Sequence, residues 1–151
     1  MGRTFGSVDE ARAAIGEEVG PGESLVVDQE RINLFADATG DHQWIHVDPE
    51  RAKDGPYGTT IAHGYLTLSL LPVLGAGLLD FAFGGARINY GVNKVRFPSP
   101  VPVGSTLSAT ATLLDVTENP SGAVATIKYV VTAQGAAKPA CVAESLVVIA
   151  P

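Results

Sequence analysis

The sequence predicts an α+β fold in a single domain that spans residues 1–151. One long apolar segment, expected to be a helix at about residues 64–79, carries no charged side chain. Four segments rich in Val, Ile, Thr and Ala follow it, and one short strand precedes it. Because a helix that is apolar on every side is enclosed by other structure, we expect a five-stranded antiparallel sheet wrapped around it.

The N-terminal part is predicted to contain a helix, a turn and the first strand. Residues 8–16 have the pattern of a short helix, and Ser7 is a suitable cap. The Gly-Pro-Gly sequence at residues 20–22 indicates a turn, and residues 24–27 are typical of a strand.

A second helix is predicted between Asp28, a suitable N-cap, and Gly40, a typical helix stop. Apolar residues recur between them at roughly helical spacing, namely Ile32, Leu34, Phe35 and Ala38. Asp48 and Pro49 predict the start of another helix. Residues 41–46 are therefore expected to form an irregular loop between two fixed elements.

The apolar helix and the strands after it complete the predicted fold. Residues 53–62 are expected to form a loop, and Pro72 is a candidate kink in the helix. The strands are expected at residues 86–97, 106–116, 123–133 and 140–149. Short connections with Pro, Gly, Asn and Ser join them, which favours antiparallel neighbours.

The composition excludes several classes of protein. Hydrophobic residues make up 46% of the chain and charged residues 17%, which is typical of a folded protein. No apolar run is long enough for a membrane span, and the N-terminus lacks a signal-peptide pattern, so we expect a cytoplasmic protein. The net charge of -6 argues against nucleic-acid binding. The single cysteine, Cys141, is interpreted as a packed apolar residue in a strand.

The loop after Gly40 carries the most informative side chains. Asp41, His42 and His46 follow one another within six residues, and a carboxylate and an imidazole at this spacing can share one water molecule. The simpler alternative is that Asp41 only closes a turn and that His46 is a half-buried histidine beside Trp44.

Several motifs together resemble the MaoC-like family of hot-dog-fold hydratases. These motifs are Gly-Asp-x4-His-x-Asp-Pro at residues 40–49, Ala-His-Gly at residues 62–64, Arg96-Phe97-Pro98, Pro100-Val101 and Val103-Gly104. The resemblance covers about residues 25–149. It is closest to stand-alone members, which include (R)-specific enoyl-CoA hydratases and the NodN-like branch.

This resemblance implies a fold, an activity and a set of site residues. The fold would be a single hot-dog domain in which an inserted loop-helix segment, about residues 41–62, carries the catalytic pair. The activity would be that of a hydro-lyase that adds water to trans-2-enoyl-CoA and gives (R)-3-hydroxyacyl-CoA without a cofactor. By position, Asp41 and His46 match the catalytic pair, and Gly64 matches the residue whose backbone N–H binds the thioester oxygen. A homodimer joined through sheet edges is also implied.

The sequence departs from the common Asp-x-Asn-Pro-x-His pattern at Gln43 and Trp44. Gln43 keeps an amide donor and acceptor, so it is a candidate for positioning the water. Candidate substrate-binding residues are His63, Tyr65, Asn93, Lys94 and Arg96.

Two alternatives concern His63. It could hydrogen-bond a loop carbonyl and orient the start of the apolar helix, or it could transfer a proton directly. A metal site formed by Asp41, His46 and His63 is conceivable from the ligand types. No helical His-x3-His pattern or Cys pair supports it, and we expect no metal.

Two other functions are compatible with the same fold. A noncatalytic subunit that binds or assembles acyl thioesters remains an alternative because of Gln43 and Trp44. A hot-dog acyl-CoA thioesterase is less favoured, because such enzymes usually have a carboxylate on the central helix and residues 65–79 contain none.

Overall fold

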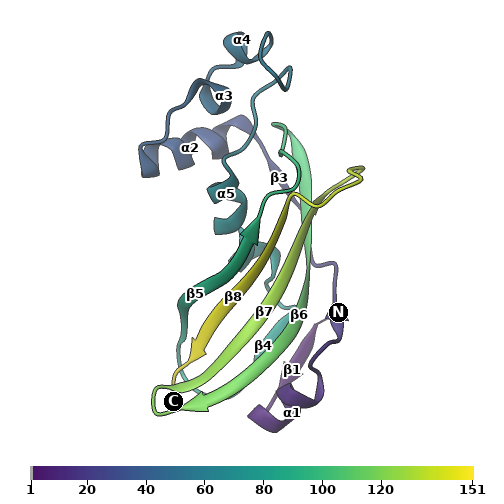
Figure 1. Ribbon diagram of the computed structural model, residues 1–151, viewed down its shortest axis with the longest axis vertical. Coiled ribbons are helices and arrows are strands. Elements are labelled where there is room, and N and C mark those ends of the chain that lie inside the picture. The colour runs from purple at the N-terminus through teal and green to yellow at the C-terminus, as the bar shows by residue number, and fades with distance from the viewer. Residues whose placement is uncertain (1) are drawn as a thin grey trace.

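The computed structural model describes residues 2–151, and its main feature is a long, curved antiparallel sheet (Figure 1). Its six strands are β2 (Glu18–Val19), β3 (Leu25–Val27), β5 (Arg87–Arg96), β6 (Ser105–Asn119), β7 (Gly122–Ala133) and β8 (Cys141–Ile149). The strand order is β2-β6-β7-β8-β5, and β3 also pairs with β6. The predicted α+β fold and the four late strands are confirmed.

The number of strands differs from the predicted five, because two short strands pair with different parts of β6. Val19 of β2 pairs with Ala111, and Leu25 of β3 pairs with Leu107. A separate parallel pair, β1 (Arg3–Phe5) and β4 (Leu79–Phe81), lies near the N-terminus. The sequence analysis did not predict β1, β2 or β4, which are too short to show a periodic pattern.

The helices are α1 (Val8–Ala13), α2 (Gln29–Thr39), α3 (Trp44–Val47), α4 (Pro49–Ala52), α5 (Gly64–Ser69) and α6 (Leu71–Leu74). The predicted caps are confirmed, because Ser7 and Asp28 accept backbone N–H groups and Gly40 ends α2 with a φ of 81°. Figure 1 shows α2, α3 and α4 beyond one end of the sheet, above α5. Among residues 2–151, no helix is both long and apolar enough to cross a membrane.

The predicted helix at residues 64–79 is shorter and interrupted. It forms α5 and α6, and its last residue becomes part of β4. Pro72 lacks the N–H that would continue the hydrogen-bond ladder. A Cβ at Gly75 would lie 2.7 Å from the ring of Tyr129, so the chain passes close to the sheet there. These constraints end the helix before residue 79.

One side of this helix pair is exposed in the single chain, which contradicts the expectation that the helix is enclosed. Tyr65 is 71% exposed and Val73 is 50% exposed. The neighbouring edge strand β5 is exposed along almost its whole length. The exposed surface includes Ile88, Tyr90 and Val92, so an apolar edge lies open beside the helices.

The opposite side of the helix pair packs on the sheet. Alternate residues of β6 are buried, beginning with Leu107 and Ala109, as expected for a strand with one buried face. Small side chains of β8, such as Ala143, leave room for the leucines of α5 and α6, namely Leu66, Leu70, Leu71 and Leu74. This packing fixes the start of α5 relative to the sheet.

Cys141 is fully buried in β8, which confirms its interpretation as a packed residue. Burial raises the pKa of its thiol from 9.0 to about 11.

The folded protein is therefore expected to resist a thiol reagent such as DTNB at pH 8, whereas the unfolded chain should react with one equivalent.

The same shift predicts a pH dependence of stability. The pKa of the Cys141 thiol is higher in the folded state than in the unfolded chain. The resulting contribution to the free energy of unfolding is complete below pH 9 and is lost as the pH rises toward 11. The free energy of unfolding should decrease more steeply over this interval in the wild type than in Cys141→Ala. Equal slopes for the two proteins would contradict the assignment.

Candidate active site

His46 lies on the single turn α3 and is only 6% exposed. The prediction of an irregular loop was therefore wrong for this residue. Its Nδ1 lies 2.7 Å from the carbonyl oxygen of Ile61. Because a carbonyl only accepts hydrogen bonds, Nδ1 carries the proton and donates it to Ile61. The lone pair is therefore on Nε2, which is the nitrogen available for proton transfer.

The backbone of α3 is held by contacts with two other segments. The N–H of Ile61 donates to the carbonyl of Ile45 at 3.0 Å. The side-chain amide of Gln29, the first residue of α2, donates to the carbonyl of His46 at 2.7 Å. The hydroxyl of the buried Thr60 donates to the other end of the Gln29 amide at 2.6 Å. Neither Gln29 nor Thr60 was predicted from the sequence to be part of the site.

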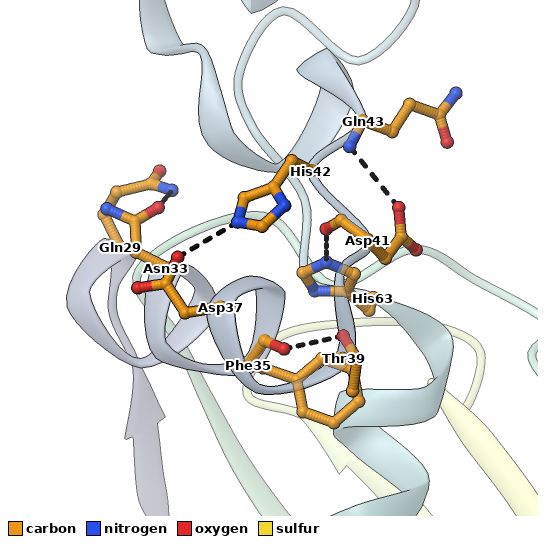
Figure 2. Close-up of polar contacts among 9 residues, drawn as sticks. All are labelled: Gln29, Asn33, Phe35, Asp37, Thr39, Asp41, His42, Gln43 and His63. Atoms are coloured by element: carbon orange, nitrogen blue, oxygen red, sulfur yellow. Dashed lines mark hydrogen bonds and ion pairs between the residues drawn. The ribbon is translucent and has the colours of Figure 1, made fainter.

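His63 precedes α5 and is 3% exposed. Its Nε2 donates to the backbone carbonyl of Asp41 at 2.9 Å (Figure 2). Its ring stacks on that of His46 with centroids 3.9 Å apart. The sequence alternative in which His63 binds a loop carbonyl is therefore confirmed. Its Nδ1 is buried and has no hydrogen-bond partner within residues 2–151.

Asp41 follows the end of α2 and is exposed, so its carboxylate is open to a ligand. One of its oxygens accepts the backbone N–H of Gln43 at 3.3 Å. Ligand atoms of Asp41, His46 and His63 lie within 4.8 Å of one another. A carboxylate and two imidazoles therefore lie close together, although they come from three different segments of the chain.

The three side chains have the ligand types of a metal site, but their geometry does not suit one. The rings of His46 and His63 are stacked with only 23° between their planes. The lone pair of an imidazole nitrogen lies in its ring plane, so nearly parallel, stacked rings do not direct both lone pairs at one ion. This geometry gives no support to a metal site.

The two residues that depart from the family pattern, Gln43 and Trp44, have different surroundings. The Gln43 side chain is exposed and points away from Asp41 in Figure 2, so only its backbone contacts the carboxylate. Trp44 lies under the guanidinium of Arg51, with the Cζ atom 4.3 Å from the indole centroid. A Cβ at Gly55 would lie 2.9 Å from the same indole. Trp44 thus joins α3 to the chain around α4.

His42 is exposed and turns toward α2 (Figure 2). Its Nε2 lies 3.0 Å from a carboxylate oxygen of Asp37. This hydrogen bond raises the pKa of His42, which favours its charged form. His42 therefore forms a surface ion pair and is separate from the buried histidines.

Gly64, the first residue of α5, offers a backbone donor beside this centre. Among the described residues 2–151, its N–H and that of Tyr65 have no acceptor, as expected for the first turn of a helix. A Cβ at Gly64 would lie 3.1 Å from the ring of Phe97. Any side chain at position 64 would therefore crowd Phe97.

The other predicted substrate-binding residues lie at the surface near α5. Tyr65 packs edge-on against Phe97, the residue that follows β5. Asn93, Lys94 and Arg96 are exposed on the last part of β5. Figure 1 shows this end of β5 beside α5, in agreement with the contact between Tyr65 and Phe97.

A separate cavity of about 570 Å³ lies between the helix pair and the strands β5, β7 and β8. Its lining includes the mainly apolar residues Leu68, Leu71, Pro72, Val92 and Tyr129. Asp41, His46 and His63 are not part of the lining. The cavity is therefore distinct from the cluster of Asp41, His46 and His63.

Comparisons with known proteins agree with the motifs and the fold. The family model described as MaoC like domain matches residues 10–135. The chain is 58% identical over 146 residues to the 3-hydroxyacyl-thioester dehydratase Z of Mycobacterium tuberculosis, covering 96% of this chain and 97% of the relative. It is 47% identical over 111 residues to nodulation protein N of Rhizobium meliloti, covering 72% and 69% of the two chains.

A solved structure of R-hydratase PhaJ1 from Pseudomonas aeruginosa has a similar fold. The TM-score is 0.72 and the sequence identity is 25%, and the match covers 91% of this chain and 81% of that one. The hot-dog architecture inferred from the sequence is therefore confirmed.

The position of Trp44 predicts an effect of Arg51→Ala. Loss of the stacked guanidinium should destabilise the fold by about 0.5–1 kcal/mol and change the emission of Trp44, the only tryptophan. Thermal unfolding and intrinsic fluorescence measure the two effects. Lys53→Ala is the matched control, because Lys53 pairs only with the exposed Glu50. The same spectral change in both variants would contradict a specific contact.

Proposed function

Because this chain belongs to the family of MaoC-like domain proteins, we propose that it is a hydro-lyase that adds water to trans-2-enoyl-CoA and forms (R)-3-hydroxyacyl-CoA. The observation that carries this proposal is the cluster of Asp41, His46 and His63, whose ligand atoms lie within 4.8 Å of one another, with Gly64 directly after His63 at the start of α5. Addition of water to an enoyl thioester requires a base, an acid and a donor for the thioester oxygen. The site supplies one group for each role.

The proposed reaction places a water molecule between Asp41 and His46. The water oxygen bonds to C3 of the enoyl group as the pair takes one proton from it. The pair returns a proton to C2, and the electron pair of the double bond forms the new C–H bond. Since the two groups act as a coupled unit, acid and base are not assigned separately. Both additions come from the same side, which gives syn hydration.

The N–H of Gly64 is proposed to bind the thioester oxygen. Negative charge grows on this oxygen as water attacks C3, and a fixed backbone donor stabilises that charge without reorganisation. His63 holds the carbonyl of Asp41 and directly precedes Gly64. One residue therefore sets the distance between the carboxylate and the oxygen-binding amide.

The remaining parts of the substrate are assigned to the surroundings of α5. The chain carries a net charge of -6, so binding of the CoA phosphates needs local cations. Lys94 and Arg96 are proposed for this role, with Asn93 and Tyr65 lining the entrance. The cavity beside Leu71 is proposed for the far end of the acyl chain, since its walls are mainly apolar.

We also propose a homodimer joined through β5, in a cytoplasmic protein. Support for the dimer comes from the exposed edge of this strand and from its apolar residues Ile88, Tyr90 and Val92. An open apolar edge is a template for pairing with another strand. A dimer formed in this way would also cover the exposed side of α5.

The two alternative functions have less support. The helices α5 and α6 carry no carboxylate, and thioesterases of this fold usually need one there. Gln43 and Trp44 kept a noncatalytic role open, but the Gln43 side chain points away from Asp41 and Trp44 stacks with Arg51.

The proposed activity is tested with crotonyl-CoA and a longer trans-2-enoyl-CoA, by following the loss of the conjugated enoyl absorbance. We expect turnover by the wild type and a decrease in kcat of at least about a hundredfold in Asp41→Asn and His46→Ala, because general acid–base groups contribute this much. A folded wild type without turnover on either substrate would favour the noncatalytic alternative.

The role of the Gly64 amide is tested by Gly64→Pro, with Gly64→Ala as its matched control. Proline is tolerated at the first position of a helix, and His63 already has the extended backbone that a following proline requires, with φ -61° and ψ 139°. Only Gly64→Pro removes the N–H, and both variants crowd Phe97. The expected loss in kcat is about a hundredfold or more for Gly64→Pro and much smaller for Gly64→Ala. Equal losses would indicate crowding instead.

A further inference from the structure

Gln29 connects three segments around His46 and has no role in the proposed reaction so far. It is the first residue of α2, and its side chain is half-buried. Its Nε2 donates to the carbonyl of His46, and its Oε1 accepts from Thr60. We call Gln29 with these two hydrogen bonds the Gln29 bridge.

The orientation of the amide in the bridge is determined by its partners. The carbonyl of His46 only accepts hydrogen bonds, so the NH2 group of Gln29 must face it. The same NH2 group donates to the side chain of Asn33 at 3.0 Å. The oxygen therefore faces the hydroxyl of Thr60, which is 1% exposed and donates to it. Each polar atom of the bridge is satisfied in this arrangement.

The helix α3 needs such a contact because it is one turn long. Helices this short have little stability of their own, and their last carbonyl groups have no partner within the helix. The carbonyl of His46 is one of these groups, and Gln29 satisfies it. Without this bond, the turn that carries the imidazole would lose one of the hydrogen bonds that hold its backbone in place.

The bridge acts together with a hydrogen bond made by the imidazole of His46 itself. The Nδ1 of His46 donates to the carbonyl of Ile61, and Ile61 is the neighbour of Thr60. The ring of His46 therefore binds Ile61 directly, and the backbone carbonyl of His46 is linked to the neighbouring Thr60 through the side chain of Gln29. Rotation of the imidazole requires that one of these bonds break.

We infer that Gln29 is a positioning residue, which together with the hydroxyl of Thr60 holds the Nε2 of His46 in the orientation needed for proton transfer. Gln29 touches no reacting atom in this account and acts only through His46. A displacement of a catalytic group by about 1 Å can reduce a rate about a hundredfold. The functional consequence rests on the proposed hydratase activity, whereas the positioning of His46 is a property of the folded chain.

The test uses two disrupting variants, each with a matched control. Gln29→Leu keeps a similar volume but removes both hydrogen bonds, and Glu30→Gln alters the adjacent exposed residue of the same helix. Thr60→Val keeps the shape of the buried side chain but removes its hydroxyl, whereas Thr60→Ser keeps the hydroxyl. Thermal unfolding of all four variants shows which of them remain folded at the assay temperature.

The first readout is the rate of enoyl-CoA hydration. Gln29→Leu and Thr60→Val should reduce kcat about ten- to a hundredfold and leave KM within about twofold, because substrate contacts are unchanged. Thr60→Ser and Glu30→Gln should keep kcat within about threefold of the wild type. Equal losses in Thr60→Val and Thr60→Ser would indicate a packing role and overturn the inference.

The second readout does not need activity. The chain has three histidines, so their ring nitrogens can be followed by 15N NMR of selectively labelled protein. We expect His46 to show a single Nδ1–H tautomer in the wild type and in both controls, and a mixture of tautomers in Gln29→Leu and Thr60→Val. A single unchanged tautomer in Gln29→Leu would overturn the positioning role, even if the wild type proved not to hydrate enoyl-CoA. Absence of wild-type turnover alone would count against the proposed function only.

Discussion

The hydrogen bond from His46 to the carbonyl of Ile61 is the interaction on which the site depends. It fixes the tautomer of a buried imidazole and leaves Nε2 with a free lone pair. A second buried imidazole, that of His63, is fixed in the same way by the carbonyl of Asp41. Both rings are therefore oriented by the backbone, and their stacking sets the distance between the loop after α2 and the start of α5.

The sheet makes this arrangement possible because it holds the start of α5 in place. The leucines of α5 and α6 pack on small side chains of β6 and β8. Ile61 forms a bridge with Pro102, in the connection that leads from β5 to β6. The backbone groups that bind His46 are thus anchored to the sheet, while Asp41 lies on the exposed side where a substrate can enter. A site for a large thioester needs groups held by a rigid scaffold and a surface that is open to the substrate.

Most of the fold and the main members of the site could be predicted from the sequence. The late strands, the caps Ser7 and Asp28 and the helix stop at Gly40 follow from local patterns, which the structure confirms. The grouping of Asp41, His46 and Gly64 as candidate site residues came from a resemblance, because residues distant in the sequence are brought together only by the fold.

The remaining features depend on contacts that no local pattern contains. The central helix is interrupted where Gly75 lies close to Tyr129 of a distant strand, a contact that the local sequence does not reveal. Gln29 was missed because a polar residue at a helix start normally faces water, and its partner Thr60 lies 31 residues away. The exposed side of α5 also could not be predicted, since an apolar helix can be covered by its own chain or by a second copy.

The most direct test of the account is the stereochemistry of hydration of crotonyl-CoA in D2O. The account predicts (R)-3-hydroxybutyryl-CoA in which the deuterium at C2 and the hydroxyl at C3 have been added to the same side, because one coupled pair, Asp41 and His46, handles both protons. An (S) product would contradict it, because water would then have attacked the opposite face of C3. Anti addition would also contradict it, because water and proton would then have to come from groups on opposite sides of the substrate.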